Sequence, residues 1–445
     1  MQTLETILTS ISDFLWSYPL LILLFGTHLF LTFRLRFIQR FIGKAIKISF
    51  SRKKEGVGDI SQFGAMTTAL AATIGTGNIV GVSTAIAAGG PGAVLWMWLT
   101  GVFGIATKYS EALLSVKYRV VGKDGMIAGG PMYVLEKGLN QKWLGILFAA
   151  FTSVTAFGIG NMVQANSISV LVHDSLGIDK WITGIILTVL TAVVIIGGIK
   201  SIAKVCEKLV PLMAIFYLLG CIILLIINYS TVPASISLIF QTAFTGHAAI
   251  GGFLGAGMKE AIRFGIARGL FSNESGLGSA PIVAAAAQTK NPVRQALVSS
   301  TGTFWDTVVV CAFTGLIIVN SFEWQNGLNG AILTKTAFAD IHIIGPIILV
   351  VGLLTFVFST ILGWSYYGEK AIEYLIGPKA VLPYRWTWVV MVFVGSVATL
   401  NLVWTFADIT NALMAIPNLI ALLFLNKVIV QETNKYLWKG NIESD

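Results

Sequence analysis

The chain has 445 residues, of which 55% are hydrophobic and 11% are charged, with a mean hydropathy of +0.80 and a formal net charge of +9. A soluble domain of this length carries about a quarter charged residues, so the composition excludes a soluble globular protein and indicates an integral membrane protein. The positive charges occur in short segments between apolar stretches. That distribution is typical of membrane topology and argues against nucleic-acid binding.

Eleven stretches are long and apolar enough to cross a bilayer, which takes about 20 residues of helix. They cover residues 13–33, 63–88, 92–118, 145–171, 181–199, 205–228, 253–287, 296–320, 343–373, 385–406 and 409–430. Eleven crossings place the termini on opposite sides of the membrane. With a cytoplasmic C-terminus, 25 of the 30 lysines and arginines fall on the inside. The positive-inside rule therefore predicts a multi-pass protein of the cell membrane with its N-terminus outside and its C-terminus in the cytoplasm.

The same pattern divides the chain into five parts. These are an N-terminal transmembrane helix (1–33), a basic cytoplasmic segment (34–62), two sets of five helices (63–228 and 229–430) and a cytoplasmic tail (431–445). In the basic segment, apolar residues recur at helical spacing from Phe37 to Ile46, with the basic residues off that stripe. This spacing favours an amphipathic helix on the anionic leaflet over a polybasic linker. We expect the polar tail to be solvated.

Two spans contain residues that a lipid-facing helix avoids. The 63–88 span contains AATIGTGN (71–78), and the 253–287 span contains FSNESGLG (271–278), which includes a carboxylate. A glycine destabilises a helix interior by about 1 kcal/mol, and an ionisable group at the bilayer centre costs roughly 3 kcal/mol or more. Irregular backbone at this depth persists only where it lines a cavity within the protein. Glycine-mediated helix packing is the alternative explanation.

The two interruptions lie about 200 residues and five spans apart. Corresponding breaks in two halves of five helices indicate an inverted-repeat transporter, because an odd number of spans inverts the second half in the membrane. Unwinding exposes amides at the N-terminus of one half-helix and carbonyls at the C-terminus of the other. Amides suit a carboxylate, and carbonyls suit a hard cation such as Na⁺. The pattern thus predicts a site for an amino acid and its coupling ion.

Motifs spread over the whole chain resemble those of the alanine/glycine:cation symporters, the sodium:alanine symporter family. They are GTGN (75–78), GGPGAVLWMW (89–98), AGGPMY (128–133), FGIGNMVQ (157–164), GGIKSI (197–202), FSNESGLGSAP (271–281), TGTFWD (301–306), STILGWSYYGEK (359–370) and AIPNL (415–419). Leu95 departs from the phenylalanine that is usual in the family.

The resemblance implies an all-α polytopic membrane protein with the LeuT-type five-plus-five inverted repeat and one extra N-terminal transmembrane helix. Helices 1 and 6 of that fold, which are broken, correspond to the 63–88 and 253–287 spans. The resemblance also implies import of a small neutral amino acid, alanine or glycine, coupled to Na⁺ by alternating access. Helices 1, 2, 6 and 7 would rock against helices 3, 4, 8 and 9.

By the same resemblance, the substrate carboxylate would lie against Thr76 and the amide of Gly77, and Gln164 would hydrogen-bond the substrate. Phe271 would wall the pocket, and Trp364 would close its side-chain end. This leaves little room beyond a methyl group. Distinguishing glycine from alanine is worth only about 1–3 kcal/mol, so both are expected substrates.

Two cation positions follow from these motifs. The main Na⁺ ligands would be the hydroxyls of Ser359 and Thr360 with the carbonyls of Ala71 and Ile74. The alternative for such a Ser-Thr pair is hydrogen bonding to its own helix. A candidate second position comprises Asn78, Ser272 and Asp306.

Four charged residues within the predicted spans have alternatives of their own. Asp306 is a functional candidate because it lies within an apolar span, and it is alternatively paired with Arg268 or protonated at a broken helix end. We expect Glu274 to brace the free amides of its own break. The i, i+3 spacing of Lys108 and Glu111 near a helix end predicts a surface ion pair.

Other function classes find less support. The four histidines fall near span ends and H-E-x-x-H is absent, so we expect neither an enzyme nor a cofactor beyond Na⁺ as the coupling ion. Rings of charge or repeated filter loops, which a channel needs, are also absent. The nearest alternatives are a transporter of the same fold that carries another small solute and one that is driven by H⁺, for which Asp306 and Glu274 are the candidate residues. The expected partners are the substrate and the lipid bilayer, and the oligomeric state is left open.

Overall fold

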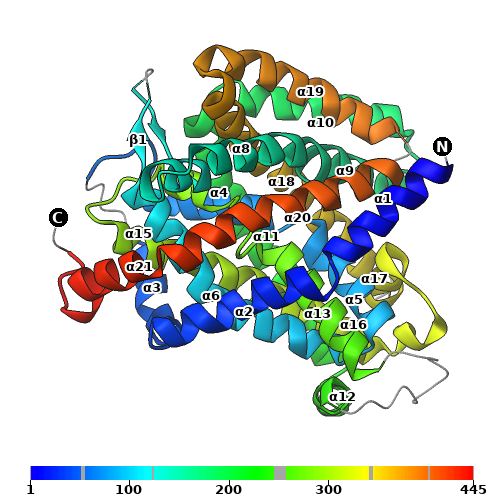
Figure 1. Cartoon of the computed structure of the whole chain (residues 1–445). Coiled ribbons are helices and arrows are strands. Elements are labelled where there is room, and N and C mark those ends of the chain that lie inside the picture. Colours follow the sequence, from blue (N-terminus) through cyan, green and yellow to red (C-terminus); the bar gives the residue numbers. More distant parts are fainter. Residues whose placement is uncertain are drawn as a thin grey trace.

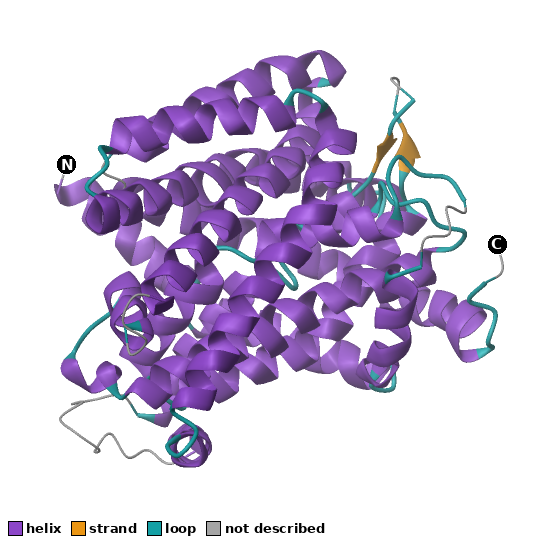
Figure 2. Ribbon diagram, turned by 180° about the vertical axis from the view of Figure 1, so that it is seen from behind, coloured by secondary structure: helices purple, strands orange, loops and turns teal. Residues whose placement is uncertain are grey.

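Figure 1 shows the computed structural model, an almost entirely helical bundle. The structure describes residues 2–51, 56–122, 125–244, 257–339, 344–398 and 401–443. The two ends of the chain lie at opposite ends of the molecule in both views (Figure 1, Figure 2). This placement agrees with an odd number of membrane crossings.

The first half of the chain begins with an extra helical segment that is followed by five spans. The extra segment comprises α1 (Gln2–Leu15), α2 (Tyr18–Arg34) and α3 (Ile42–Ser49). The spans comprise α4 (Gln62–Thr73) with α5 (Val82–Gly89), α6 (Ala93–Lys117), α8 (Lys142–Phe157) with α9 (Val163–Leu176), α10 (Lys180–Ile195) and α11 (Gly198–Ile227). After α6 come the short antiparallel strands β1 (Val120–Val121) and β2 (Ile127–Ala128) and the single turn α7 (Pro131–Tyr133).

The second half repeats the pattern with two additional short helices. Its spans comprise α13 (Met258–Asn273) with α14 (Pro281–Ala284), α15 (Pro292–Thr303) with α16 (Ala312–Ser321), α18 (Ile344–Ile376), α19 (Val381–Val397) and α20 (Asn401–Phe424). The additional helices are α12 (Val232–Phe244) and α17 (Gly330–Phe338), and α21 (Asn426–Thr433) begins the tail. We did not predict α12 or α17, because both are shorter than a membrane span.

Seven helices in the described residues are long and apolar enough to cross a bilayer, and the bent pair of α4 and α5 makes an eighth. The predicted spans 92–118, 181–199 and 253–287 are also helical, as α6, α10 and α13. However, α6 and α13 carry charged residues, and α10 has only 16 residues. Apolar side chains of α10 and α11 face outward: Val193 is 73% exposed and Ile226 is 64% exposed. Such a surface suits lipid rather than water.

The helices pack in two groups. In the first group, α6 packs against α13 and α15, and α13 also packs against α5. In the second group, α18 packs against α8, and α10 packs against α19, which lies beside it in Figure 1. The first group corresponds to helices 1, 2, 6 and 7 of the expected repeat, and the second to helices 3, 4, 8 and 9.

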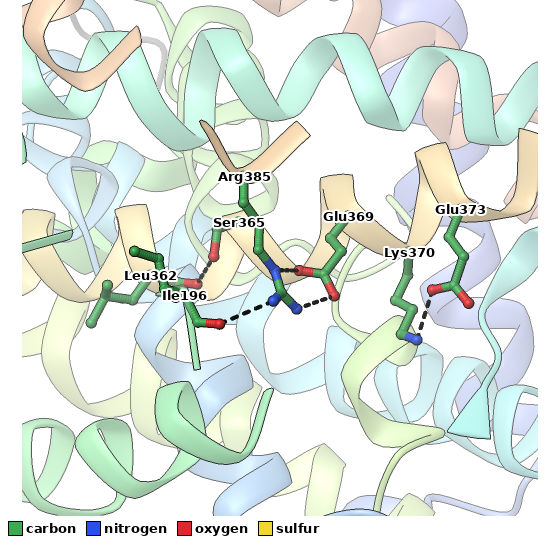
Figure 3. A network of polar contacts seen from close by, with 7 residues as sticks. All are labelled: Ile196, Leu362, Ser365, Glu369, Lys370, Glu373 and Arg385. Carbon is green, nitrogen blue, oxygen red and sulfur yellow. Dashed lines mark hydrogen bonds and ion pairs between the residues drawn. The ribbon is translucent and has the colours of Figure 1, made fainter. Parts of the chain in front are cut away.

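A polar network holds the second group together at one end of α18 (Figure 3). Arg385 of α19 donates to both oxygens of Glu369, at 2.6 and 2.8 Å, and to the carbonyl of Ile196 at 3.1 Å. The next residue of α18, Lys370, pairs with Glu373 of the same helix at 2.8 Å. The bonds of Arg385 join α18, α19 and the residue that follows α10.

Several predicted boundaries were wrong. The N-terminal helix, expected over 13–33, extends back to Gln2 and is interrupted near Ser17, just before Pro19. The span expected over 385–406 ends at Val397, and the next begins at Asn401 rather than at 409. Apolar composition alone does not mark these ends, since the connecting residues are apolar as well. The first residues of the span expected from 253 lie outside the described part of the chain.

The two flanking segments are more closely packed than we predicted. The basic segment does form a helix, α3, but Ala45 and Ile48 of its apolar side are buried and α3 packs against α15. The tail, expected to be solvated, is docked: Ile442 is buried, and its carbonyl accepts from the side chain of Asn291 at 2.9 Å. The polar composition of these segments does not reveal such contacts, because their partner residues lie elsewhere in the chain.

Candidate substrate and cation site

The first break separates α4 from α5. After α4, Ile74 is extended (φ −76°, ψ 96°), and a π-helical turn (Gly77–Gly81) leads into α5, whose axis is turned by 53° from that of α4. The side-chain oxygen of Asn78 accepts the Gly75 amide at 2.9 Å, which closes the open turn. Residues 71–79 are all buried. The predicted interruption is therefore present and faces protein.

The second break separates α13 from α14. Glu274 is left-handed (φ 55°), as are Gly276 (φ 90°) and Gly278 (φ 86°). The two glycines adopt this conformation without a steric cost because they lack a Cβ. Residues 272–280 are all buried. This interruption is also present and faces the interior.

Glu111 of α6 satisfies the exposed backbone of the second break. Its Oε1 accepts the amides of Gly276 at 3.0 Å and Gly278 at 3.1 Å, and the side-chain amide of Asn418 at 2.6 Å. Asn418 also donates to the Gly276 carbonyl at 2.9 Å. The predicted Lys108–Glu111 surface pair is wrong, because the two residues are only 4% and 2% exposed. A carboxylate within an apolar span, and an asparagine in the AIPNL motif, were the available signals.

Glu274 has a different role from the one we predicted. Its Oε1 accepts the indole N–H of Trp364 at 3.0 Å, and its Oε2 accepts the hydroxyl of Ser279 at 2.5 Å. The glycine amides of the break are bound by Glu111 instead. The prediction failed because it considered only residues near in sequence.

The predicted substrate residues meet at the first break. The side-chain amide of Gln164, on α9, donates to the Thr76 hydroxyl at 3.3 Å. Gly77 packs closely against α13, because a Cβ added to it would lie 3.4 Å from Phe271 Cδ1 and 3.3 Å from the Cα of Ser272. Thr76, Gly77 and Gln164 are buried, whereas Phe271 is partly exposed. Three separate spans thus contribute to one small region.

One acceptor in this region is unsatisfied. The Oε1 of Gln164 is buried and has no hydrogen-bond partner among the described residues, while its Nε2 also donates to the Ile159 carbonyl at 2.9 Å. Buried polar atoms in proteins are almost always paired. The Oε1 of Gln164 is an exception to that pattern, and it lies among the predicted substrate residues beside the unwound helix.

Trp364 of α18 lies beside the same region. Its side chain covers Gly160, which lies in the π-helical turn that joins α8 to α9. A Cβ added to Gly160 would overlap the side chain of Trp364. Gln164 is one turn further along that helix. Trp364 is 1% exposed, and its ring meets that of Tyr367 edge-on, with centroids 5.4 Å apart. The indole is therefore buried against the turn that leads into α9, one helical turn before Gln164.

The predicted main cation ligands are close together. The Ser359 hydroxyl lies 3.3 Å from the Ala71 carbonyl, and the Thr360 hydroxyl lies 3.3 Å from the Ile74 carbonyl. Both hydroxyls also donate to the carbonyl of Phe356 in their own helix, at 2.8 and 3.0 Å. The alternative of bonding within the helix is thus present too. Four neutral oxygens at the end of α4 fit a hard monovalent cation.

The predicted second cation residues also converge. Asn78 donates to Asp306 Oδ1 at 2.7 Å, and Ser272 and Thr307 donate to Oδ2 at 2.9 and 2.6 Å. Asp306 lies in a π-helical segment (Phe304–Cys311) between α15 and α16 and is fully buried. The group therefore joins the first broken span to the seventh helix of the repeat.

The alternative partner of Asp306, Arg268, lies elsewhere. Its guanidinium is 5.9 Å from the ring centroid of Phe271 and lines a cavity of about 120 Å³ together with Asp408 of α20. Phe271 forms part of the same cavity wall. The cavity thus reaches the partly exposed side of the candidate substrate region. Among the described residues, no cluster of three or more histidine, cysteine or acidic side chains could hold a transition metal.

Comparison with known proteins agrees with this arrangement. The sodium:alanine symporter family profile matches residues 1–444. The chain is 50% identical over 442 residues to the sodium/alanine symporter AgcS of Methanococcus maripaludis, covering 97% of each chain. It is 37% identical over 444 residues to the probable sodium/glutamine symporter GlnT of Bacillus subtilis, covering 98% of this chain and 91% of that one.

The crystal structure of MhsT in complex with L-phenylalanine has the same fold. The TM-score is 0.58 at 16% sequence identity, and the match covers 84% of this chain and 90% of that one. This similarity confirms the LeuT-type architecture expected from the motifs. The profile and the relatives are those of symporters, so the chain is a multi-pass membrane transporter that couples amino-acid movement to Na⁺ and is not an enzyme. The chain belongs to the sodium:alanine symporter family.

Proposed function

We propose that this protein imports alanine, glycine or both with Na⁺ by alternating access. The observation that carries the proposal is the buried Oε1 of Gln164, which lacks a partner among the described residues and lies beside Thr76 at the first break. An unpaired buried acceptor costs about 1–3 kcal/mol. The ammonium group of an amino acid would supply the missing donor.

The opposite end of the same substrate has a matching place. Thr76 and Gly77 begin a helical turn, and the first amides of a helix have no acceptor within it. These amides, with the positive end of the helix dipole, suit a carboxylate. A zwitterion would therefore span from the first break to Gln164, with its side chain directed toward Trp364.

The size limit would come from Trp364 and Phe271. The indole is buried and packed on Gly160, and on this proposal it would leave room for hydrogen or methyl but not for a longer side chain. The name of a relative, the probable sodium/glutamine symporter GlnT, agrees with a size limit that differs within the family. We therefore expect Trp364→Ala to admit larger amino acids, and an unchanged preference would remove the indole as the limiting wall.

Na⁺ suits the site better than H⁺ does. The four oxygens at Ser359, Thr360 and the end of α4 are neutral and carry no titratable group. Asp306 receives three donated hydrogen bonds, an arrangement that stabilises an ionised carboxylate. Each Na⁺ moved with a zwitterion carries one charge, worth about 2.3 kcal/mol at 100 mV. That energy supports about a fiftyfold gradient of substrate.

Uptake into proteoliposomes tests the proposal. Labelled alanine is supplied under an inward Na⁺ gradient at constant pH and, separately, under an inward H⁺ gradient without Na⁺. We expect accumulation only with Na⁺, with competition by unlabelled glycine and little by glutamine. Accumulation that follows H⁺ and ignores Na⁺ would refute the coupling ion, and competition by glutamine alone would reassign the substrate.

We also propose which side of the membrane each terminus lies on. The distribution of basic residues places the N-terminus outside and the C-terminus inside. On that orientation the cavity beside Arg268 and Asp408, which also borders α1, opens toward the outside. Labelling of single cysteines introduced at Ser10 and Lys439 in intact cells would test it, with only the first expected to react with an impermeant reagent.

A further inference from the structure

We propose that Glu274 is a positioning residue that sets the substrate size limit by holding the indole of Trp364. The inference rests on the proposed function, because it assumes that Trp364 walls the substrate pocket. Its basis is one bond: Trp364 Nε1 donates to Glu274 Oε1 at 3.0 Å across 90 residues of chain. Both side chains are buried, at 1% and 3% exposure.

The backbone at Glu274 does not itself favour glutamate. The residue follows the end of α13 in the left-handed conformation, where glycine or asparagine is usual because other residues are strained. A glutamate at such a position indicates that its side chain is needed. That side chain spans its own break to the hydroxyl of Ser279 and reaches the indole on α18.

The other contacts of the indole restrict how deeply it is buried, but they do not fix the orientation of its ring. Gly160 provides a flat surface beneath it, and Tyr367 meets its edge. Neither contact is polar. Among the described residues, the carboxylate of Glu274 is the acceptor of the indole N–H, so this bond determines which way the ring points.

The bond also joins the two groups of helices. Glu274 belongs to the break after α13, which packs with α5 and α6, whereas Trp364 belongs to α18, which packs with α8 and α11. A substrate with a larger side chain must displace the indole and leave two buried polar atoms unpaired. The exclusion is therefore sharper than packing alone would make it.

Substitutions can separate the hydrogen bond of Glu274 from its charge. Glu274→Gln keeps an oxygen acceptor for the indole but removes the charge, whereas Glu274→Ala removes both. Trp364→Phe keeps an aromatic ring and removes the donor.

The test uses Na⁺-driven uptake of labelled alanine by the full-length protein, with unlabelled glycine and valine as competitors. We expect Trp364→Phe and Glu274→Ala each to lower the half-inhibitory valine concentration relative to that of glycine by about tenfold. The double variant should show no further change, and Glu274→Gln should retain the wild-type ratio. Such non-additivity identifies residues that act as one unit.

Three results would overturn the inference. They are an unchanged ratio in Trp364→Phe, single effects that multiply in the double variant, and equal loss of uptake for all substrates in a Glu274→Ala protein that is folded and present at the wild-type level. Because Trp364→Phe retains an aromatic ring, it tests the inference even when Glu274→Ala does not fold. Absence of Na⁺-driven uptake of both alanine and glycine by the wild-type protein would refute the proposed function, and the inference with it. Normal wild-type uptake with unaltered ratios in the variants would refute the inference alone.

Discussion

Asn78 donates its side-chain amide to a carboxylate oxygen of Asp306 at 2.7 Å, although the two residues are 228 positions apart. The side-chain oxygen of Asn78 accepts the amide of Gly75 in the first break. One asparagine thus connects the unwound backbone to a buried acidic residue. A change at Asp306 should consequently affect the substrate region.

We expect Asp306→Asn to reduce Na⁺-driven alanine uptake by at least about tenfold and to alter its Na⁺ dependence. The substitution places an amide where Asn78, Ser272 and Thr307 all donate, so at least one buried donor loses its acceptor, at about 1–3 kcal/mol. Initial rates measured over a series of Na⁺ concentrations check this. Asp174→Asn, the same change at an exposed position, is the control. A wild-type Na⁺ curve in Asp306→Asn would rule out the second cation position.

Thr360→Ala should raise the Na⁺ concentration for half-maximal uptake by about five- to tenfold, corresponding to about 1 kcal/mol. The change removes one of the four oxygens that gather at the end of α4. Thr355→Ala is a matched control, because that hydroxyl bonds to carbonyls of its own helix, at Val351 and Gly352. Equal Na⁺ curves for the two variants would dismiss the main cation site.

Gly160→Ala should abolish most alanine uptake. The added Cβ overlaps the side chain of Trp364, and the indole must move into the space assigned to the substrate. Forcing an extra carbon into a packed interior typically costs about 1–3 kcal/mol. Gly302→Ala serves as the control, since its nearest neighbour would be a Leu70 methyl at 3.9 Å. If both variants transport alanine normally, the indole is not as confined as proposed.

Glu111→Ala should lower the thermal stability of the purified protein. It leaves the amides of Gly276 and Gly278 and the side-chain amide of Asn418 without their shared acceptor, and each buried donor left unpaired costs about 1–3 kcal/mol. A thermal melt in detergent measures the loss. Glu323→Ala removes a carboxylate whose hydrogen bond to Asn326 is exposed, and its melt should match the wild type. Equal melts for both variants would show that the second break does not depend on Glu111.

Much of the architecture is predictable because its signals are local. Apolar length marks a membrane span, and clustered glycine and polar residues mark a break, so sequence alone identifies the interruptions at AATIGTGN and FSNESGLG. The motifs also point to twelve site residues, and in the folded protein these residues gather at the two breaks. What they bind stays a proposal.

The tertiary structure decided which side chain meets which break. The sequence predicts that Glu111 forms a surface ion pair and that Glu274 binds the free amides of its own break. Both predictions rest on residues that are near in sequence. In the folded protein Glu111 reaches glycines 165 and 167 residues away, and Glu274 reaches Trp364. Hydrophobicity determines that a segment lies in the membrane, but the rotation of each helix depends on packing against all the others. Partners across helices are therefore visible only once the helices are assembled.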